Sequence, residues 1–86
     1  MSPVWFHQIT GLHPLKVAYQ AGTLTFEQSR DQQVAVLRAS AAYRVDDFAA
    51  VVDELAETTD EVDFDEVLAC LYDECDRHRI WLDPVR

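Results

Sequence analysis

Four residues near the end of the chain have the types and the spacing that could bind a metal ion. Cys70 and Glu74 are four residues apart, and Cys75 and His78 are three apart, so each pair can share one side of a helix. A tetrahedral zinc site, however, needs four ligands that converge on one point. On a helix Cys70 lies about 140° around the axis from Cys75, and the two other histidines are isolated in the sequence. We therefore expect no metal and no other cofactor.

The acidic run 59–66 has the composition of a calcium-binding loop but not its spacing. An EF-hand loop has oxygen ligands at alternate positions, a glycine at its sixth position and a glutamate at its twelfth. A loop counted from Asp60 has Val62 at the third position, Asp65 at the sixth and Leu71 at the twelfth. We expect these acids to cap a helix and to face solvent.

Catalysis is not indicated by any residue pattern. The hydroxyls and thiols lie in neither a nucleophile elbow nor a phosphate-binding loop, and the chain has only two glycines. The many carboxylates are expected on a solvated face, where nothing shifts their pKa values as a general acid requires. The expectation is a protein that is not an enzyme, and no motif identifies a family.

These residues must be positioned by helices, and the best helix signal spans residues 63–79. Apolar residues recur there every three or four positions. Asp63 is predicted to cap its start, with Glu66 completing a capping box and Val62 and Val67 forming a hydrophobic staple. The basic residues at its end oppose the helix dipole. The apolar stripe that needs a partner is Phe64, Val67, Leu68, Leu71, Tyr72 and Cys75.

Three further helices are predicted upstream. One covers about 14–21 and ends at a glycine. The second opens with a capping box, Thr25–Gln28, and reaches about Ala42, and the third runs from Val45 to a polar break at 58–61. The residues predicted to face the core from these helices are Leu15, Ala18, Tyr19, Phe26, Gln33, Val34, Leu37, Ala41, Phe48, Val51, Val52 and Leu55.

The two ends of the chain are harder to assign. Residues 1–10 fit a helix or a strand, because both periodicities suit so short a run. At the other end, the apolar segment 80–82 follows a charged helix terminus. We expect this tail to pack back on the bundle, with Trp81 against Trp5 and Phe6. The alternative is that Trp81 is an exposed anchor for a partner, since interfaces favour tryptophan.

Together these elements predict an all-α fold, a small compact bundle of about four helices with short loops and the apolar C-terminal tail packed back on it. A chain of 86 residues has room for one domain, 1–86, with a thin core. The first residues lack the basic region and the long apolar run of a signal peptide, and no window reaches transmembrane length. We expect a cytoplasmic protein with free thiols.

Charge is the strongest functional signal. The net charge is −9, and residues 45–76 contain 13 acids and no Lys or Arg. A chain of this kind cannot assemble the basic surface that nucleic acid or an anionic membrane requires, so neither is expected as a direct partner. A surface with interspersed acidic and basic residues would serve solubility equally well. A surface with acidic residues alone produces a negative electric field that steers a basic partner protein.

The sequence therefore predicts a small non-catalytic binding protein, a regulator or inhibitor that docks an acidic helical face on a basic partner protein. The face could imitate the phosphates of nucleic acid for a partner that binds nucleic acid. The alternative is a self-associating structural protein, a homodimer formed through the apolar helix stripe and the Trp81 tail, in which the acids serve only solubility. The residues assigned to the docking surface are Asp46, Asp47, Asp53, Glu54, Glu57, Asp60, Glu61, Asp65, Glu66, Asp73, Asp76 and Trp81.

Overall fold

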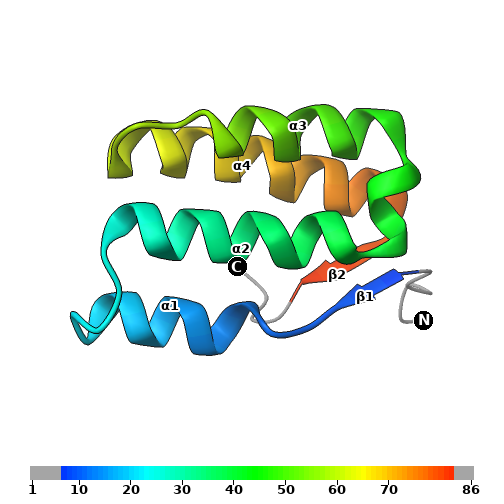
Figure 1. Cartoon of the computed structure of the whole chain (residues 1–86). Coiled ribbons are helices and arrows are strands. Elements are labelled where there is room, and N and C mark those ends of the chain that lie inside the picture. Colours follow the sequence, from blue (N-terminus) through cyan, green and yellow to red (C-terminus); the bar gives the residue numbers. More distant parts are fainter. Residues whose placement is uncertain (1–6, 83–86) are drawn as a thin grey trace.

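The computed structural model describes residues 7–82 (Figure 1). Four α-helices lie side by side; α2 packs against α3, α3 against α4, and α1 against α2. This arrangement confirms the predicted all-α bundle. Its elements, in chain order, are β1 (His7–Ile9), α1 (Leu12–Gln20), α2 (Phe26–Ala39), the 3-10 helix η1 (Ala41–Arg44), α3 (Asp46–Ala56), α4 (Glu61–His78) and β2 (Ile80–Leu82).

The starts of α2 and α4 test the predicted caps. Thr25 and Gln28 form the full capping box, each side chain bonded to the backbone N–H of the other. The cap predicted for α4 is wrong. Asp60, not Asp63, is the N-cap, and its Oδ1 accepts a 2.8 Å bond from the backbone N–H of Asp63. The helix therefore begins earlier, and the predicted staple is absent because Val62 is 68% exposed.

The end of α2 also differs from the prediction. The helix ends at Ala39 rather than near Ala42 because Ser40 has extended backbone and its Oγ caps η1 through the backbone N–H of Ala42. This change rotates the following residues. Ala42 is fully buried, whereas Ala41, which was predicted to face the core, is exposed.

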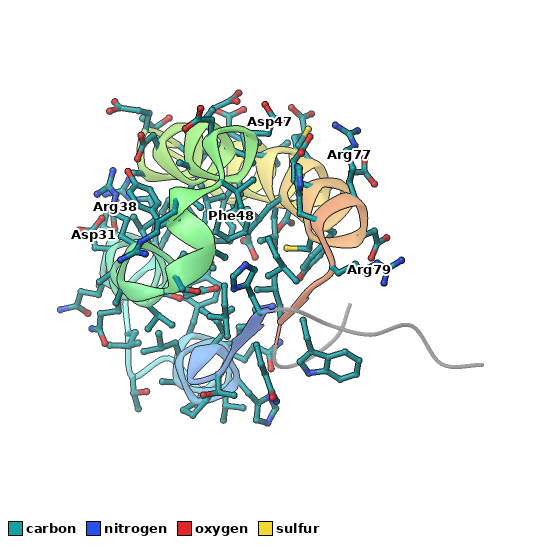
Figure 2. All side chains as sticks on the ribbon, turned by 90° about the vertical axis from the view of Figure 1, so that its right-hand side faces the viewer. Asp31, Arg38, Asp47, Phe48, Arg77 and Arg79 are labelled. Atoms are coloured by element: carbon teal, nitrogen blue, oxygen red, sulfur yellow. The ribbon has the colours of Figure 1, made fainter. Side chains whose placement is uncertain are left out.

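The core is built from the apolar stripes that the helical periodicity predicts. Phe48, Val52 and Leu55 of α3 are fully buried, and Leu71 and Cys75 of α4 pack in the same cluster. The end-on view in Figure 2 shows Phe48 in the interior, with the labelled charged side chains at the periphery. The stripe of α4 is therefore used inside the protein.

The two strands bring the ends of the described chain together. β1 pairs with β2 in parallel, with His7 opposite Ile80 and Ile9 opposite Leu82. The chain enters β2 through Arg79, whose φ of 57° ends α4 in the left-handed conformation. The pairing resolves the open assignment of residues 7–9 in favour of a strand, and it confirms that the C-terminal tail packs back on the bundle.

Within β2, the alternation of a strand decides which side chains are buried. Ile80 and Leu82 are buried and Trp81, between them, is half-buried. The predicted contact of Trp81 with Trp5 and Phe6 lies outside the described residues. In the part of the chain that the structure describes, no helix combines the length and the apolar character needed to cross a membrane.

Candidate functional site

One hollow on the acidic surface lies where α3 ends and α4 begins. It is an open depression of about 270 Å³ whose lining includes four carboxylate side chains, and we call it the acidic groove. Thr58 and Val67 complete the lining. The carboxylates of the acidic groove belong to Glu54, Glu57, Asp63 and Glu66.

A short turn between the helices brings these carboxylates together. The hydroxyl of Thr58 donates a 2.7 Å bond to the carbonyl of Leu55, which closes the end of α3. Two residues later Asp60 caps α4, so the last turn of α3 and the first turn of α4 lie side by side. Helical spacing puts Asp63 and Glu66 on one side of α4, and both line the same depression as Glu54 of α3.

The carboxylates of the acidic groove form no ion pair within the described part of the chain, although the guanidinium of Arg30 donates to the carbonyl of Thr58, one of the lining residues. Like charges held around one depression add their potentials, and a protein wall of low dielectric concentrates the field over it. The arrangement can therefore attract an ammonium or guanidinium group from outside.

Asp53, which was also assigned to the docking surface, is engaged inside the chain. Its Oδ1 accepts hydrogen bonds from Tyr43 and from Arg38. The bond from Tyr43, followed by that from Arg38, lowers the pKa of Asp53, and the same contact with Asp53 raises the pKa of Tyr43.

Glu61 and Asp65 lie on another side of α4, where they line a pocket of about 210 Å³ between α1, α2 and α4. The wall of this aromatic pocket is formed by edge-to-face contacts of Phe26 with Tyr19 and with Phe64. Burial, and then the negative charge of Glu61, raise the pKa of the Tyr19 hydroxyl. The sequence did not predict this pocket, although all three rings were assigned to inward faces.

The remaining predicted residues are spread around α3 and α4. Asp46 is exposed in the first turn of α3, and Asp73 and Asp76 are exposed along α4. Asp60 is used as a helix cap, and Trp81 lies on β2, beyond the other end of α4. The predicted acids thus line two separate hollows, serve other contacts or lie exposed on α3 and α4, and the acidic groove gathers three of them, Glu54, Glu57 and Glu66.

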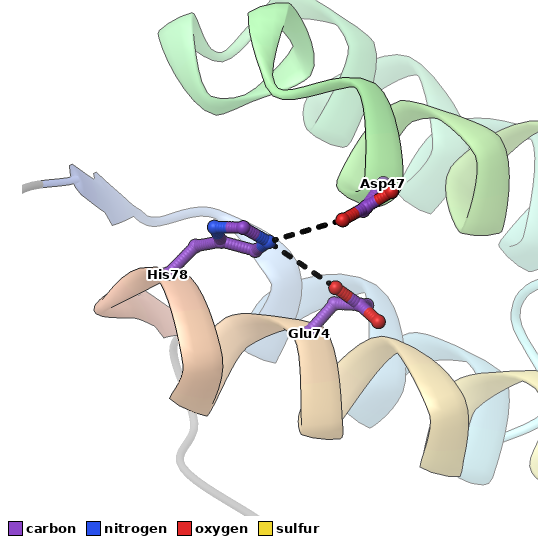
Figure 3. A group of neighbouring side chains, drawn as sticks. All are labelled: Asp47, Glu74 and His78. Atoms are coloured by element: carbon purple, nitrogen blue, oxygen red, sulfur yellow. Dashed lines mark ion pairs between the residues drawn. The ribbon is translucent and has the colours of Figure 1, made fainter.

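A second group of polar side chains, one histidine and two carboxylates, joins the opposite ends of the same two helices (Figure 3). Nε2 of His78 lies 3.3 Å from Oε2 of Glu74, one turn back on α4, and 3.7 Å from Oδ2 of Asp47 at the start of α3. We call these three residues the His78 cluster. The sequence pattern suggests Glu74 and His78 as ligands only beside the two cysteines, in a site that the helical geometry disfavours, and it otherwise indicates that His78 is a basic residue that compensates the helix dipole.

Comparison of the chain with protein-family models, with curated proteins and with solved structures gives no match.

Proposed function

We propose that this protein is a small non-catalytic docking protein that binds a basic partner protein through the acidic groove. The observation that carries the proposal is the convergence on one depression of four carboxylates that form no ion pair with the described residues. Solvation explains single exposed acids, but it does not require four of them to line one hollow. The cytoplasm is the proposed location.

The chemistry of the acidic groove favours an Arg or Lys side chain of the partner. A guanidinium group has five N–H donors in a planar fork, and each carboxylate offers two acceptor oxygens. Val67 supplies apolar surface in the same depression, against which the methylene groups of a long basic side chain can pack. Binding would occlude the basic surface of the partner, and the negative field would raise the association rate.

Trp81 is proposed as a separate contact rather than as part of the groove. Glu66 lies twelve residues before the end of α4, which at about 1.5 Å per residue places it roughly 18 Å from the helix terminus that leads into β2. A partner that touched both would need a broad interface. The homodimer remains a prediction, but the stripe of α4 that was to form it packs inside the chain.

The proposal can be tested with two variants of equal charge. The groove variant carries Glu54→Gln, Glu57→Gln, Asp63→Asn and Glu66→Gln. The dispersed variant carries Glu27→Gln, Asp46→Asn, Asp65→Asn and Asp73→Asn, all at exposed positions outside the groove. Each set removes four negative charges, so the net charge of −9 becomes −5 in both.

The tagged wild-type protein and both variants are used to capture proteins from lysate of the source cell, with elution by rising salt and identification by mass spectrometry. We expect the wild type and the dispersed variant to retain one basic protein that salt releases sharply, and the groove variant to lose it. Equal retention by both variants would contradict the groove as the docking site. Binding that does not respond to salt would contradict the charge-driven mechanism.

A further inference from the structure

The His78 cluster has the donor set of a metal site. Its three ligand atoms, one imidazole nitrogen and two carboxylate oxygens, all lie within 4.8 Å of one another. Glu74 and His78 are separated by one helical turn on α4, and Asp47 approaches from α3 (Figure 3). We propose that these three side chains bind a divalent first-row transition-metal ion such as zinc, which would tie the start of α3 to the end of α4.

The distances from Nε2 of His78 to the two carboxylate oxygens are close to those of a tetrahedral ion. Zinc binds histidine nitrogen and carboxylate oxygen at about 2.0–2.2 Å, so two such donors on one tetrahedral ion lie about 3.3–3.6 Å apart. Nε2 of His78 lies 3.3 Å from the Glu74 oxygen and 3.7 Å from the Asp47 oxygen. The Asp47 and Glu74 oxygens lie within 4.8 Å of each other, so an ion requires Asp47, whose side chain is 68% exposed, to move toward it. Three protein ligands leave a fourth position for water.

The two donor atoms on α4 are also poorly satisfied within the protein. Nε2 of His78 and Oε2 of Glu74 are inaccessible to solvent, and neither has a hydrogen-bond partner among the described residues. The two atoms lie 3.3 Å apart, which is close enough for one ion to coordinate both. Buried polar groups are normally paired, and a coordinated ion would satisfy both atoms.

A neighbouring residue holds the glutamate in place. Nη1 of Arg77 donates a 2.9 Å bond to Oε1 of Glu74, which leaves Oε2 directed at His78. Hydrogen bonds to the second oxygen of a ligating carboxylate are typical of metal sites, because they fix the orientation of the ligand. Arg77 is thus a positioning residue for the site. Imidazole with two carboxylates suits zinc, cobalt and related ions better than calcium or magnesium, which prefer oxygen ligands alone.

The test uses the full chain with the exposed thiol removed. Cys70 lies one turn before Glu74 and is a strong zinc ligand in its own right, so Cys70→Ser is the background for every variant. Zinc ions are titrated calorimetrically at neutral pH, and cobalt ions are followed by their visible absorption. Circular dichroism verifies that each variant is folded. The ligand variants are Asp47→Asn, Glu74→Gln and His78→Asn.

Each ligand variant has a matched control nearby or of the same type. Asp46→Asn removes the acid beside Asp47, Asp73→Asn removes the acid beside Glu74, and His13→Asn removes an exposed histidine on α1. We expect saturable one-to-one binding that each ligand variant weakens by about tenfold or more, and that the controls change by less than about twofold. No saturable binding in the Cys70→Ser background, or equal losses in ligand and control variants, would overturn the proposal.

Discussion

Tyr43 donates a 2.6 Å hydrogen bond to Oδ1 of Asp53. The same oxygen accepts a 3.0 Å bond from Nη2 of Arg38 near the end of α2. The contact joins α2 and η1 to α3 at the surface of the bundle. Asp53 therefore differs from the acids of the acidic groove, because the charge of Asp53 is paired with Arg38 within the chain.

This contact predicts that the free energy of unfolding decreases at low pH, where Asp53 becomes protonated. Tyr43 and then Arg38 hold the pKa of Asp53 below its ordinary value of 3.8, so the contact stabilises the fold fully above that value. The contribution is lost as the pH falls from 3.8 through the lower pKa of the folded state. Asp53→Asn is therefore expected to be less stable than the wild type at neutral pH, and the difference should shrink under acid. Urea unfolding at several pH values measures it.

Asp46→Asn is the control for this prediction, because Asp46 is an exposed acid in the first turn of the same helix. A deficit for Asp53→Asn that is constant between neutral and strongly acid pH would contradict the assigned role of the carboxylate.

The corrected start of α4 can be checked with two neighbouring substitutions. Asp60 accepts the capping bond, whereas Asp63 contributes only its backbone N–H to that bond and its charge to the first turn. Asp60→Ala is expected to cost about 1 kcal/mol of unfolding free energy. Asp63→Ala should cost only a few tenths of a kcal/mol through the helix dipole. Equal losses in urea unfolding would indicate that both residues act as caps.

The pairing of β1 with β2 predicts that shortening the side chain of Ile80 strongly lowers the free energy of unfolding. Its side chain is 1% exposed and stands opposite His7 in the strand register. Ile80→Ala is expected to lower the free energy of unfolding by about 2–5 kcal/mol, and Ile80→Val by about 0.5–1.5 kcal/mol. Ile80→Val keeps the measurement possible where the alanine variant does not fold. Thermal unfolding that is unchanged by both substitutions would contradict the burial of this strand.

Local patterns were sufficient to predict most of the helices. The capping box at Thr25 and the stripe around Phe48 and Leu71 depend on residues three or four positions apart, and such contacts form wherever the helix forms. The error at the start of α4 has the same local origin. Asp60 and Asp63 can each cap a helix, and the sequence alone does not decide which of them leaves the helical conformation.

Features made by distant residues could not be predicted in this way. His7 and Ile80 pair across 73 positions, and neither periodicity nor turn chemistry links them. The His78 cluster shows the same limit, because Asp47 lies 27 residues before Glu74 and on another helix. Spacing on one helix suggested cysteine ligands, whereas the packing of α3 on α4 brings a carboxylate to the histidine instead. The acidic run itself was visible in the sequence, but its hollow depends on the turn at Thr58.

The acidic groove predicts a salt response in the absence of any partner. Its four carboxylates repel one another in the folded protein, and that repulsion weakens when salt screens it. Raising sodium chloride from about 0.02 M to about 0.5 M shortens the Debye length from about 20 Å to about 4 Å, so the wild type should become more stable. The groove variant should gain less than the dispersed variant, because it lacks the converging charges. Urea unfolding of the three proteins at both salt concentrations measures this, and equal gains in the two variants would show that the repulsion comes from the total charge rather than from the groove.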